Sequence, residues 1–318
     1  MTAEIAGFLF GTLLLIIGAD SFVRGAAGLA LRSGAGSYTV ALLSTALGAL
    51  VPALAVTLAA GFSTRPELAL GNLIGSSIAQ LGLVLGICAL TASLRARMKL
   101  FAWLDPAAIA AAVLVWLLAL DARIGTIDGV ILILAYIVVA ALVVRGARRE
   151  DQALRNELEN ATGTDMLVWR DGLRVVVGVL ILPFAAVWLV DGALAIADGL
   201  ALSPIVVGLV LLGAATALAS VWPTVLAARR GQSDFAIGHA LGAVLGNLLL
   251  LLGGLALWQT VAVARSLQHV EIPALVVLAV AIYPMMRSDG ELSRREGIIL
   301  VVAYAVFLVG ESWLAKAG

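Results

Sequence analysis

Apolar residues occur along the chain in ten long runs, and short segments with charged or turn-forming residues separate one run from the next. The runs cover approximately residues 4–29, 37–60, 68–93, 101–119, 125–145, 171–195, 204–228, 235–257, 269–286 and 296–314. A helix needs about 20 mostly apolar residues to cross the hydrocarbon core of a bilayer. The pattern therefore predicts an all-α integral membrane protein with ten membrane-spanning helices.

The two halves of this pattern repeat at a fixed offset of 167 residues. From Val23 to Gly86 the offset needs no gap, and it gives 15 identities in 64 pairs. The repeat units begin on the first and sixth runs, so five spans separate them and the second unit enters the membrane from the opposite face. We expect two inverted five-helix repeats, residues 1–146 and 171–318, joined by a loop at 147–170.

Composition supports the membrane class. The chain is 62% hydrophobic and 13% charged, with a mean hydropathy of +1.10, and a water-exposed shell would need more charge. The net charge of zero gives no reason to expect a nucleic-acid partner. Of the 20 basic residues, 16 lie in or near the connections on one side of the predicted membrane. This asymmetry predicts that the 147–170 loop is cytoplasmic and that both termini are outside, in a bacterial plasma (inner) membrane.

Each repeat carries two motifs with polar or turn-forming residues. In the first repeat they are Gly48-Ala49-Leu50-Val51-Pro52-Ala53 and, one span later, Gly71-Asn72, Gly75-Ser76 and Gln80. In the second repeat they are Ala215-Thr216-Ala217-Leu218-Ala219-Ser220 and then Gly238-His239, Gly242-Ala243 and Asn247. These stretches resemble the two repeats of the calcium/cation antiporter family, which includes sodium/calcium exchangers. The resemblance spans nearly the whole chain and implies a secondary cation transporter, an antiporter that works by alternating access.

The first motif of each repeat departs from the family pattern. Members of the family usually carry Gly-Thr-Ser-x-Pro-Glu in each repeat, and the two glutamates meet at the membrane midplane. Here Ala53 and Ser220 stand in the two glutamate positions. Both of the carboxylates that the resemblance would assign to the ion site are therefore missing.

Five neutral side chains with oxygen atoms remain at the matching positions: Ser76, Gln80, Thr216, Ser220 and Asn247. Calcium prefers about six to eight oxygen ligands, usually with carboxylates among them, whereas neutral oxygens can hold a monovalent cation. We expect the partner to be a small inorganic cation, with sodium, a proton or another monovalent ion favoured over calcium. The alternative is that these residues only join helices by hydrogen bonds.

Glycines and prolines of the motifs have expected structural roles. The pairs Gly71/Gly75 and Gly238/Gly242 have the small-xxx-small spacing that lets helices approach closely. Pro52 and Pro223 are expected to break or bend the second and seventh spans, because proline removes a helix hydrogen bond.

The sequence leaves open the roles of four ionisable residues near span ends. Asp20 could pair with Arg24 at the i,i+4 spacing. His239 could sense pH, or it could be a neutral hydrogen-bonded imidazole near Asp234 and the lipid headgroups. Asp105 and Glu311 are expected to be interfacial.

Three classes of function can be weighed on these residues. A transporter with altered selectivity fits the retained polar residues Gln80 and Asn247. A nontransporting regulatory or partner-binding membrane protein with a decayed ion site is the alternative. An enzyme is not expected, because the sequence shows no Ser/His/Asp set and no metal-ligand cluster, and no cofactor is implied.

Overall fold

The computed structural model describes residues 2–32, 37–63, 65, 67–95, 101–147, 168–288 and 290–317. The helices of the first half are α1 (Thr2–Arg32), α2 (Ser37–Phe62), α3 (Glu67–Ala79), α4 (Leu85–Thr91), α5 (Phe101–Leu118) and α6 (Thr126–Ala147). Those of the second half are α8 (Val168–Leu200), α9 (Pro204–Val207), α10 (Gly213–Arg229), α11 (Ser233–Leu245), α12 (Leu252–Trp258), α13 (Ile272–Ser288) and α14 (Arg294–Ala317).

Short turns of other helix types join several of these helices. The π-helical turns are η1 (Gln80–Val84) between α3 and α4, η3 (Gly208–Leu212) between α9 and α10, η4 (Gly246–Leu251) between α11 and α12, and η5 (Leu267–Glu271) before α13. A 3₁₀ turn, η2 (Ala119–Asp121), ends α5. Because the π turns continue the helix on both sides, α3–η1–α4 and α11–η4–α12 each form a single membrane span.

The all-α membrane architecture is confirmed. Within the described residues, nine helical segments are long and apolar enough to cross a membrane. The α2 helix is outside that set, because the apolar stretch identified in it, Leu50–Phe62, is shorter than a full span. The count of ten spans therefore remains a prediction that depends on α2. The middle of the expected 147–170 loop lies outside the described residues, between the end of α6 and the start of α8.

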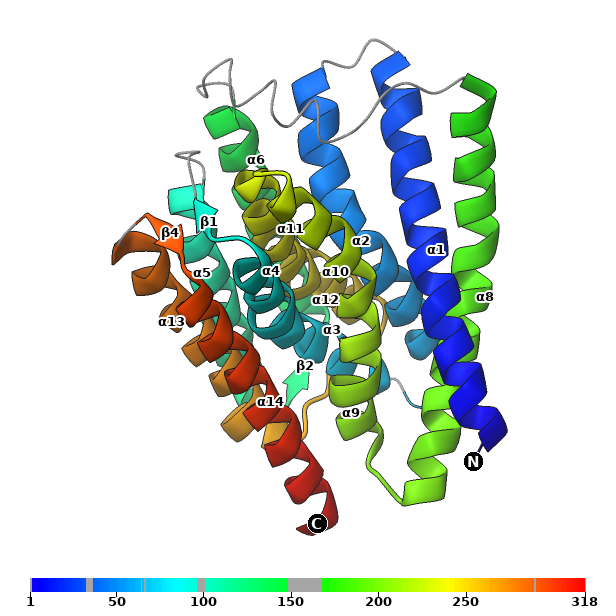
Figure 1. The fold of residues 1–318 in the computed structure, drawn as a ribbon. Coiled ribbons are helices and arrows are strands. Elements are labelled where there is room, and N and C mark those ends of the chain that lie inside the picture. Colours follow the sequence, from blue (N-terminus) through cyan, green and yellow to red (C-terminus); the bar gives the residue numbers. More distant parts are fainter. Residues whose placement is uncertain are drawn as a thin grey trace.

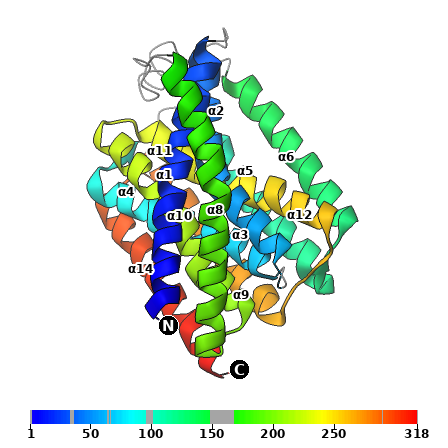
Figure 2. The ribbon, with the colours of Figure 1, turned by 90° about the vertical axis from the view of Figure 1, so that its right-hand side faces the viewer.

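The two halves of the molecule run in opposite directions. In Figure 1 the chain rises from α3 to α4 but descends from α11 to α12, and both termini lie at the same end of the bundle (Figures 1 and 2). α1 and α8 lie side by side in both views, at the right-hand edge in Figure 1 and in front of the bundle in Figure 2. A Cβ atom added at Gly11 would lie 2.8 Å from the backbone nitrogen of Leu189, so the α1 and α8 backbones approach closely.

Two small strand pairs connect the halves. β1 (Leu94–Arg95) pairs antiparallel with β4 (Glu291–Leu292), and β2 (Arg123–Ile124) pairs antiparallel with β3 (Val261–Ala262). Leu94 and Val261, which begin β1 and β3, are separated by the same 167 residues as the motifs. Each repeat therefore uses an equivalent segment to pair with a segment of the other repeat, one beyond α4 and the other beyond α12.

Neither motif proline interrupts its helix. α2 stays helical through Pro52, and α10 stays helical through Pro223. A proline removes one backbone hydrogen bond, and the bonds on either side of it preserve the helix. The departures from α-helical geometry occur instead at the π turns. η1 begins at Gln80 and η4 begins beside Asn247, so these two residues lie at the irregular points of their spans.

Candidate functional site

One buried face of α10 carries three hydroxyl side chains. Thr216, Ser220 and Thr224 follow one another at intervals of four residues, which places them on the same side of the helix, and all three are buried. The spacing of Thr216 and Ser220 predicts their shared face, and Thr224 extends this face by one further turn. The hydroxyl of Thr224 donates a hydrogen bond to the backbone carbonyl of Ser220, so Thr224 bonds back to its own helix.

A chain of hydrogen bonds crosses three helices through Asn72 of α3. Thr216 Oγ1 donates to Asn72 Oδ1 at 2.8 Å, and Asn72 Nδ2 donates to Thr57 Oγ1 of α2 at 3.3 Å. Asn72 and Thr57 were not among the predicted site residues. The signal that could have found Thr57 is its repeat partner Thr224, an identical residue at the 167-residue offset.

Gln80 and Asn247 make equivalent contacts from opposite halves of the molecule. Gln80 Nε2 donates to Ser220 Oγ of α10 at 3.1 Å. Asn247 Nδ2 donates to Ser76 Oγ of α3 at 3.0 Å and reaches Ser77 Oγ at 3.4 Å. Each amide therefore donates a hydrogen bond to a serine of the other repeat. Together with the bond from Thr216 to Asn72, these bonds bring all five predicted candidates into contacts between the two repeats.

We call the following nine residues the polar cluster: Thr57, Asn72, Ser76, Ser77, Gln80, Thr216, Ser220, Thr224 and Asn247. Every one of them is less than 5% exposed. They come from four spans, namely α2, α3–η1–α4, α10 and α11–η4–α12, which pack against one another. None of the nine side chains carries a charge at neutral pH. The polar cluster is thus a neutral, water-excluded group of oxygen and nitrogen atoms within the bundle.

Two oxygen atoms of the polar cluster have no hydrogen-bond partner within the described part of the chain. They are Gln80 Oε1 and Asn247 Oδ1, which belong to repeat-equivalent residues. A buried polar atom without a partner costs about 1–3 kcal/mol. A hydrogen-bond donor or a cation that binds to amide oxygen would remove this cost at the same place in both halves.

The backbone at these two residues is also equivalent. In η1 the nitrogen of Leu85 donates to the carbonyl of Gln80, and in η4 the nitrogen of Leu252 donates to the carbonyl of Asn247. Both are the five-residue bonds of a π turn, which is rare and is often found at functional sites. The π turns were not predicted, because the apolar pattern along these spans does not differ from that of an ordinary α-helix.

The positions of the missing carboxylates face the same interior. Ala53 is completely buried and stands one helical turn before Thr57 on α2, so the two residues share a face. Ser220 accepts the hydrogen bond of Gln80. Among the described residues there is no group of three or more His, Cys, Asp or Glu side chains that could hold a metal ion.

The motif glycines differ between the repeats. A Cβ at Gly71 would lie 2.7 Å from the backbone oxygen of Ile205, and one at Gly75 would overlap the backbone of Leu209. At Gly242, the repeat partner of Gly75, a Cβ would meet no described atom within 4 Å. The close approach between helices is therefore found at α3, where it brings the α9–η3–α10 span against Ser76 and Asn72.

Asp20 and His239, two of the ionisable residues near span ends, lie in different surroundings. Asp20 Oδ1 accepts a hydrogen bond from Arg24 Nε at 2.7 Å, as the spacing predicted. His239 is buried against α2 and its ring stacks on Phe235, with ring centroids 5.8 Å apart. The imidazole is therefore packed between helices, where Gly48 leaves space for it.

Five carboxylates are buried outside the polar cluster: Asp105 on α5, Asp171 on α8, Asp234 on α11, Glu271 in η5 and Glu311 on α14. Asp105 lies near the start of α5 and Glu311 near the end of α14, and neighbouring helices cover both side chains, so their interfacial depth stays a prediction. Glu271 and Glu311 are close enough to interact electrostatically. Four of these acids lie on spans that contribute nothing to the polar cluster. Asp234 lies at the start of α11, 13 residues or about 20 Å of helix before Asn247, so none of the five replaces the missing carboxylates.

Comparison with known proteins gives a consistent result. The family model described as "Sodium/calcium exchanger protein" matches residues 3–145 and 172–313. The chain is 25% identical to the inner membrane protein YrbG of Escherichia coli, over 99% of this chain and 98% of that protein. It is 23% identical to the sodium/calcium exchanger MaX1 of Methanosarcina acetivorans, over 97% and 98% of the two chains. A solved structure of the sodium-calcium exchanger NCX_Mj is similar in fold, with a TM-score of 0.69 and 22% identity over 97% of this chain and 98% of that one.

Proposed function

The chain belongs to the sodium/calcium exchanger family of membrane transporters, and from this premise we propose that its transport site is electrically neutral and favours a monovalent cation over calcium. The observation that carries the proposal is the pair of buried, unpartnered amide oxygens of Gln80 and Asn247 in the described structure. A cation that binds between the repeats would satisfy both atoms. The serine and threonine hydroxyl oxygens beside them supply further ligands.

The charge of the site supports a monovalent ion. Moving an ion from water into a low-dielectric interior is costly unless counter-charge or many oxygen ligands replace its hydration. Calcium carries twice the charge of sodium and usually takes carboxylate ligands in proteins. The polar cluster offers only amide and hydroxyl oxygens, and Ala53 and Ser220 stand where a relative could place two carboxylates. A dehydrated sodium ion fits this donor set better than calcium does.

The same chemistry distinguishes sodium from a proton. Amide and hydroxyl groups do not gain or lose protons near neutral pH, so no residue of the polar cluster could hold a transported proton. Of a monovalent metal ion and a proton, the polar cluster therefore favours a metal ion such as sodium. A proton would have to bind to another group of the molecule.

Transport by alternating access would expose the polar cluster to each side of the membrane in turn. α1 and α8 are the suitable moving unit, because they lie together along one edge of the bundle and contribute no residue to the polar cluster (Figures 1 and 2). Their close contact lets them move as a pair. Movement of this pair would open and close the path from the water to the polar cluster, whose residues belong to the other spans.

The orientation follows from the distribution of basic residues. We propose that both termini are outside and that the connection between α6 and α8 is cytoplasmic, because most of the basic residues are on that side. The two termini lie at the same end of the bundle, which this orientation requires (Figure 1). The membrane is proposed to be a bacterial inner membrane, like that of the relative YrbG.

Removal of either unpartnered oxygen tests the site directly. Gln80→Leu and Asn247→Leu each keep a similar side-chain volume but remove the amide. Because each change deletes one ion ligand, we expect sodium to bind about tenfold more weakly or worse, which is about 1.4 kcal/mol. The measurement is equilibrium binding of radioactive sodium to the purified protein.

A matched control is available on another span. Gln268 is also a buried amide, and its Nε2 donates to the backbone oxygen of Ala119, outside the polar cluster. The Gln268→Leu variant should bind sodium as the wild type does. Unchanged sodium affinity in both cluster variants would place the ion elsewhere, and no sodium binding by the folded wild type would favour a nontransporting relative with a decayed site.

A further inference from the structure

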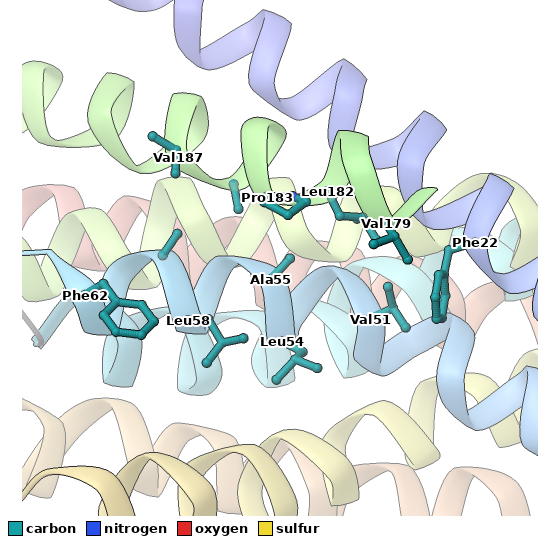
Figure 3. A pocket seen from close by; sticks show the side chains of 12 residues that line it. Phe22, Val51, Leu54, Ala55, Leu58, Phe62, Val179, Leu182, Pro183 and Val187 are labelled. Atoms are coloured by element: carbon teal, nitrogen blue, oxygen red, sulfur yellow. The ribbon is translucent and has the colours of Figure 1, made fainter. Parts of the chain in front are cut away.

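An apolar groove of about 430 Å³ lies between α2 and α8 (Figure 3). Its walls come from both helices, and Phe22 of α1 lies at one end. The main lining residues are Val51, Leu58 and Phe62 of α2 and Val179, Pro183 and Val187 of α8. The groove is thus placed where the α1–α8 pair meets the rest of the bundle.

The groove opens toward the lipid and not toward the polar cluster. Leu54, Leu58 and Phe62 on its α2 side are 42%, 43% and 76% exposed, on a helix that we expect to lie within the bilayer. Ala53 and Thr57 point to the interior from the opposite side of the same helix and are buried. Water has no hydrogen-bond partner in a groove lined by carbon atoms, so it would not fill this space. A hydrocarbon chain would fill it, because it needs no hydrogen-bond partner.

The length of the groove matches one leaflet of a bilayer. From Val51 to Phe62 is 11 residues of helix, or about 16 Å at the usual rise of 1.5 Å per residue. The hydrocarbon core of a bilayer is about 30 Å thick, so one acyl chain reaches about half of it. Val51, at the inner end of the groove, is two residues before Ala53 and six before Thr57, the residue of α2 that belongs to the polar cluster. At the outer end, Phe62 packs on Trp258 with ring centroids 4.4 Å apart, as aromatic side chains do near the membrane surface.

Charged side chains of both signs lie just beyond the outer end. Arg65, three residues after Phe62, forms an ion pair with Asp198 of α8, with Nη2 and Oδ1 at 3.0 Å. Both side chains are partly exposed, so a headgroup can reach them. A phosphate group can accept hydrogen bonds from the guanidinium, and an ammonium group can donate to the carboxylate. A headgroup with one charge of each sign is therefore complementary to this pair.

We propose that the groove is a binding site for one acyl chain of a zwitterionic phospholipid that carries an ammonium group, with its phosphate at Arg65 and its ammonium at Asp198. The acyl chain lies against the side of α2 that faces away from the polar cluster. It also lies in the seam between α2 and α8. The bound lipid thus supports the helix that carries Thr57, and it stands where the α1–α8 pair would have to move.

Native mass spectrometry of the detergent-purified protein tests the site. The probes are phosphatidylethanolamine, phosphatidylglycerol and palmitic acid, offered at equal concentrations. We expect the wild type to retain one phosphatidylethanolamine at least fivefold more often than either of the other probes. Equal retention of the three probes would overturn the proposed headgroup recognition, and no retained lipid would overturn the site.

Two kinds of variant separate the acyl-chain site from the headgroup site. Ala55 lines the groove, so Ala55→Phe fills it and should lower phosphatidylethanolamine retention at least fivefold. Leu134→Phe, at a lipid-exposed position of α6, is the matched control and should retain lipid normally. Wild-type retention by the folded Ala55→Phe variant would contradict the proposal.

The headgroup variants remain informative if Ala55→Phe does not fold. Arg65→Gln and Asp198→Asn change exposed side chains and should fold. We expect both to lose the preference for phosphatidylethanolamine over phosphatidylglycerol. A preserved preference in both variants would contradict the assigned headgroup contacts.

Discussion

Replacement of Ala53 and Ser220 together by glutamate is expected to create a calcium site in this protein. Ala53 and Ser220 are buried, are related by the repeat, and occupy faces of α2 and α10 that carry residues of the polar cluster. Two carboxylates there would join the unpartnered oxygens of Gln80 and Asn247, which gives the mixture of charged and neutral oxygens that calcium prefers.

The double variant should be unstable without calcium. Two buried carboxylates with no counter-charge repel each other and lose their hydration, so we expect a loss of about 3–5 kcal/mol in the free energy of unfolding. Calcium at a hundredfold excess over its dissociation constant would restore about 2.7 kcal/mol by mass action. The melting temperature of the double variant should therefore rise steeply with calcium, whereas that of the wild type should not.

Titration calorimetry on the purified proteins measures the new affinity. The control is Ala53→Gln with Ser220→Gln, which adds side chains of the same size without charge and should not bind calcium. If the folded glutamate variant binds no calcium, the surrounding oxygens are not arranged as a calcium site, and the proposal that the two missing carboxylates exclude calcium is wrong.

Among the single substitutions, Gly75→Ala is expected to have the largest effect on stability. A Cβ at Gly75 would overlap the backbone oxygen of Leu209, and one at Gly213 would lie 2.6 Å from the carbonyl carbon of Gly75. Because the neighbouring atoms belong to the backbone of η3 and α10, no side chain can rotate to make room. We expect Gly75→Ala to cost about 3 kcal/mol and to push α10 away from Ser76.

The repeat supplies the control for this prediction. At Gly242, the equivalent glycine of the second half, a Cβ would meet no described atom within 4 Å, so Gly242→Ala should leave the melting temperature nearly unchanged or raise it slightly. Thermal unfolding of the two variants in the same detergent, followed by circular dichroism, gives the comparison. Equal effects of the two substitutions on the melting temperature would contradict the close backbone contact of α3 with η3 and α10 at Gly75.

The arrangement of the spans could be predicted from the sequence because the bilayer imposes it. Every backbone group in the hydrocarbon must be paired within its own helix, so a run of about 20 apolar residues leaves little choice of structure. The 167-residue repeat then gave the relation between the halves, which is visible in the opposite directions of α3–α4 and α11–α12 (Figure 1). The continuity of α2 and α10 through their prolines was harder to predict, because one lost hydrogen bond can either break a helix or be tolerated.

The candidate site could be predicted only in part. Ser76, Gln80, Thr216, Ser220 and Asn247 were found because they stand at motif positions, and the structure places them in one buried cluster. Asn72 and Thr57 were missed, since their roles depend on hydrogen bonds to partners on other helices. The sequence also gave no sign that Gly75 and Gly242 differ, because the close contact at Gly75 comes from a segment more than a hundred residues away.

The central claim is that the polar cluster carries a monovalent cation and not calcium. The most direct test is the uptake of radioactive sodium and of radioactive calcium, measured in parallel, into proteoliposomes that contain the wild-type protein and an outward sodium gradient. The account predicts saturable sodium exchange that is lost in Asn247→Leu, with calcium uptake no greater than in protein-free liposomes. Saturable, high-affinity calcium uptake driven by the sodium gradient would contradict it.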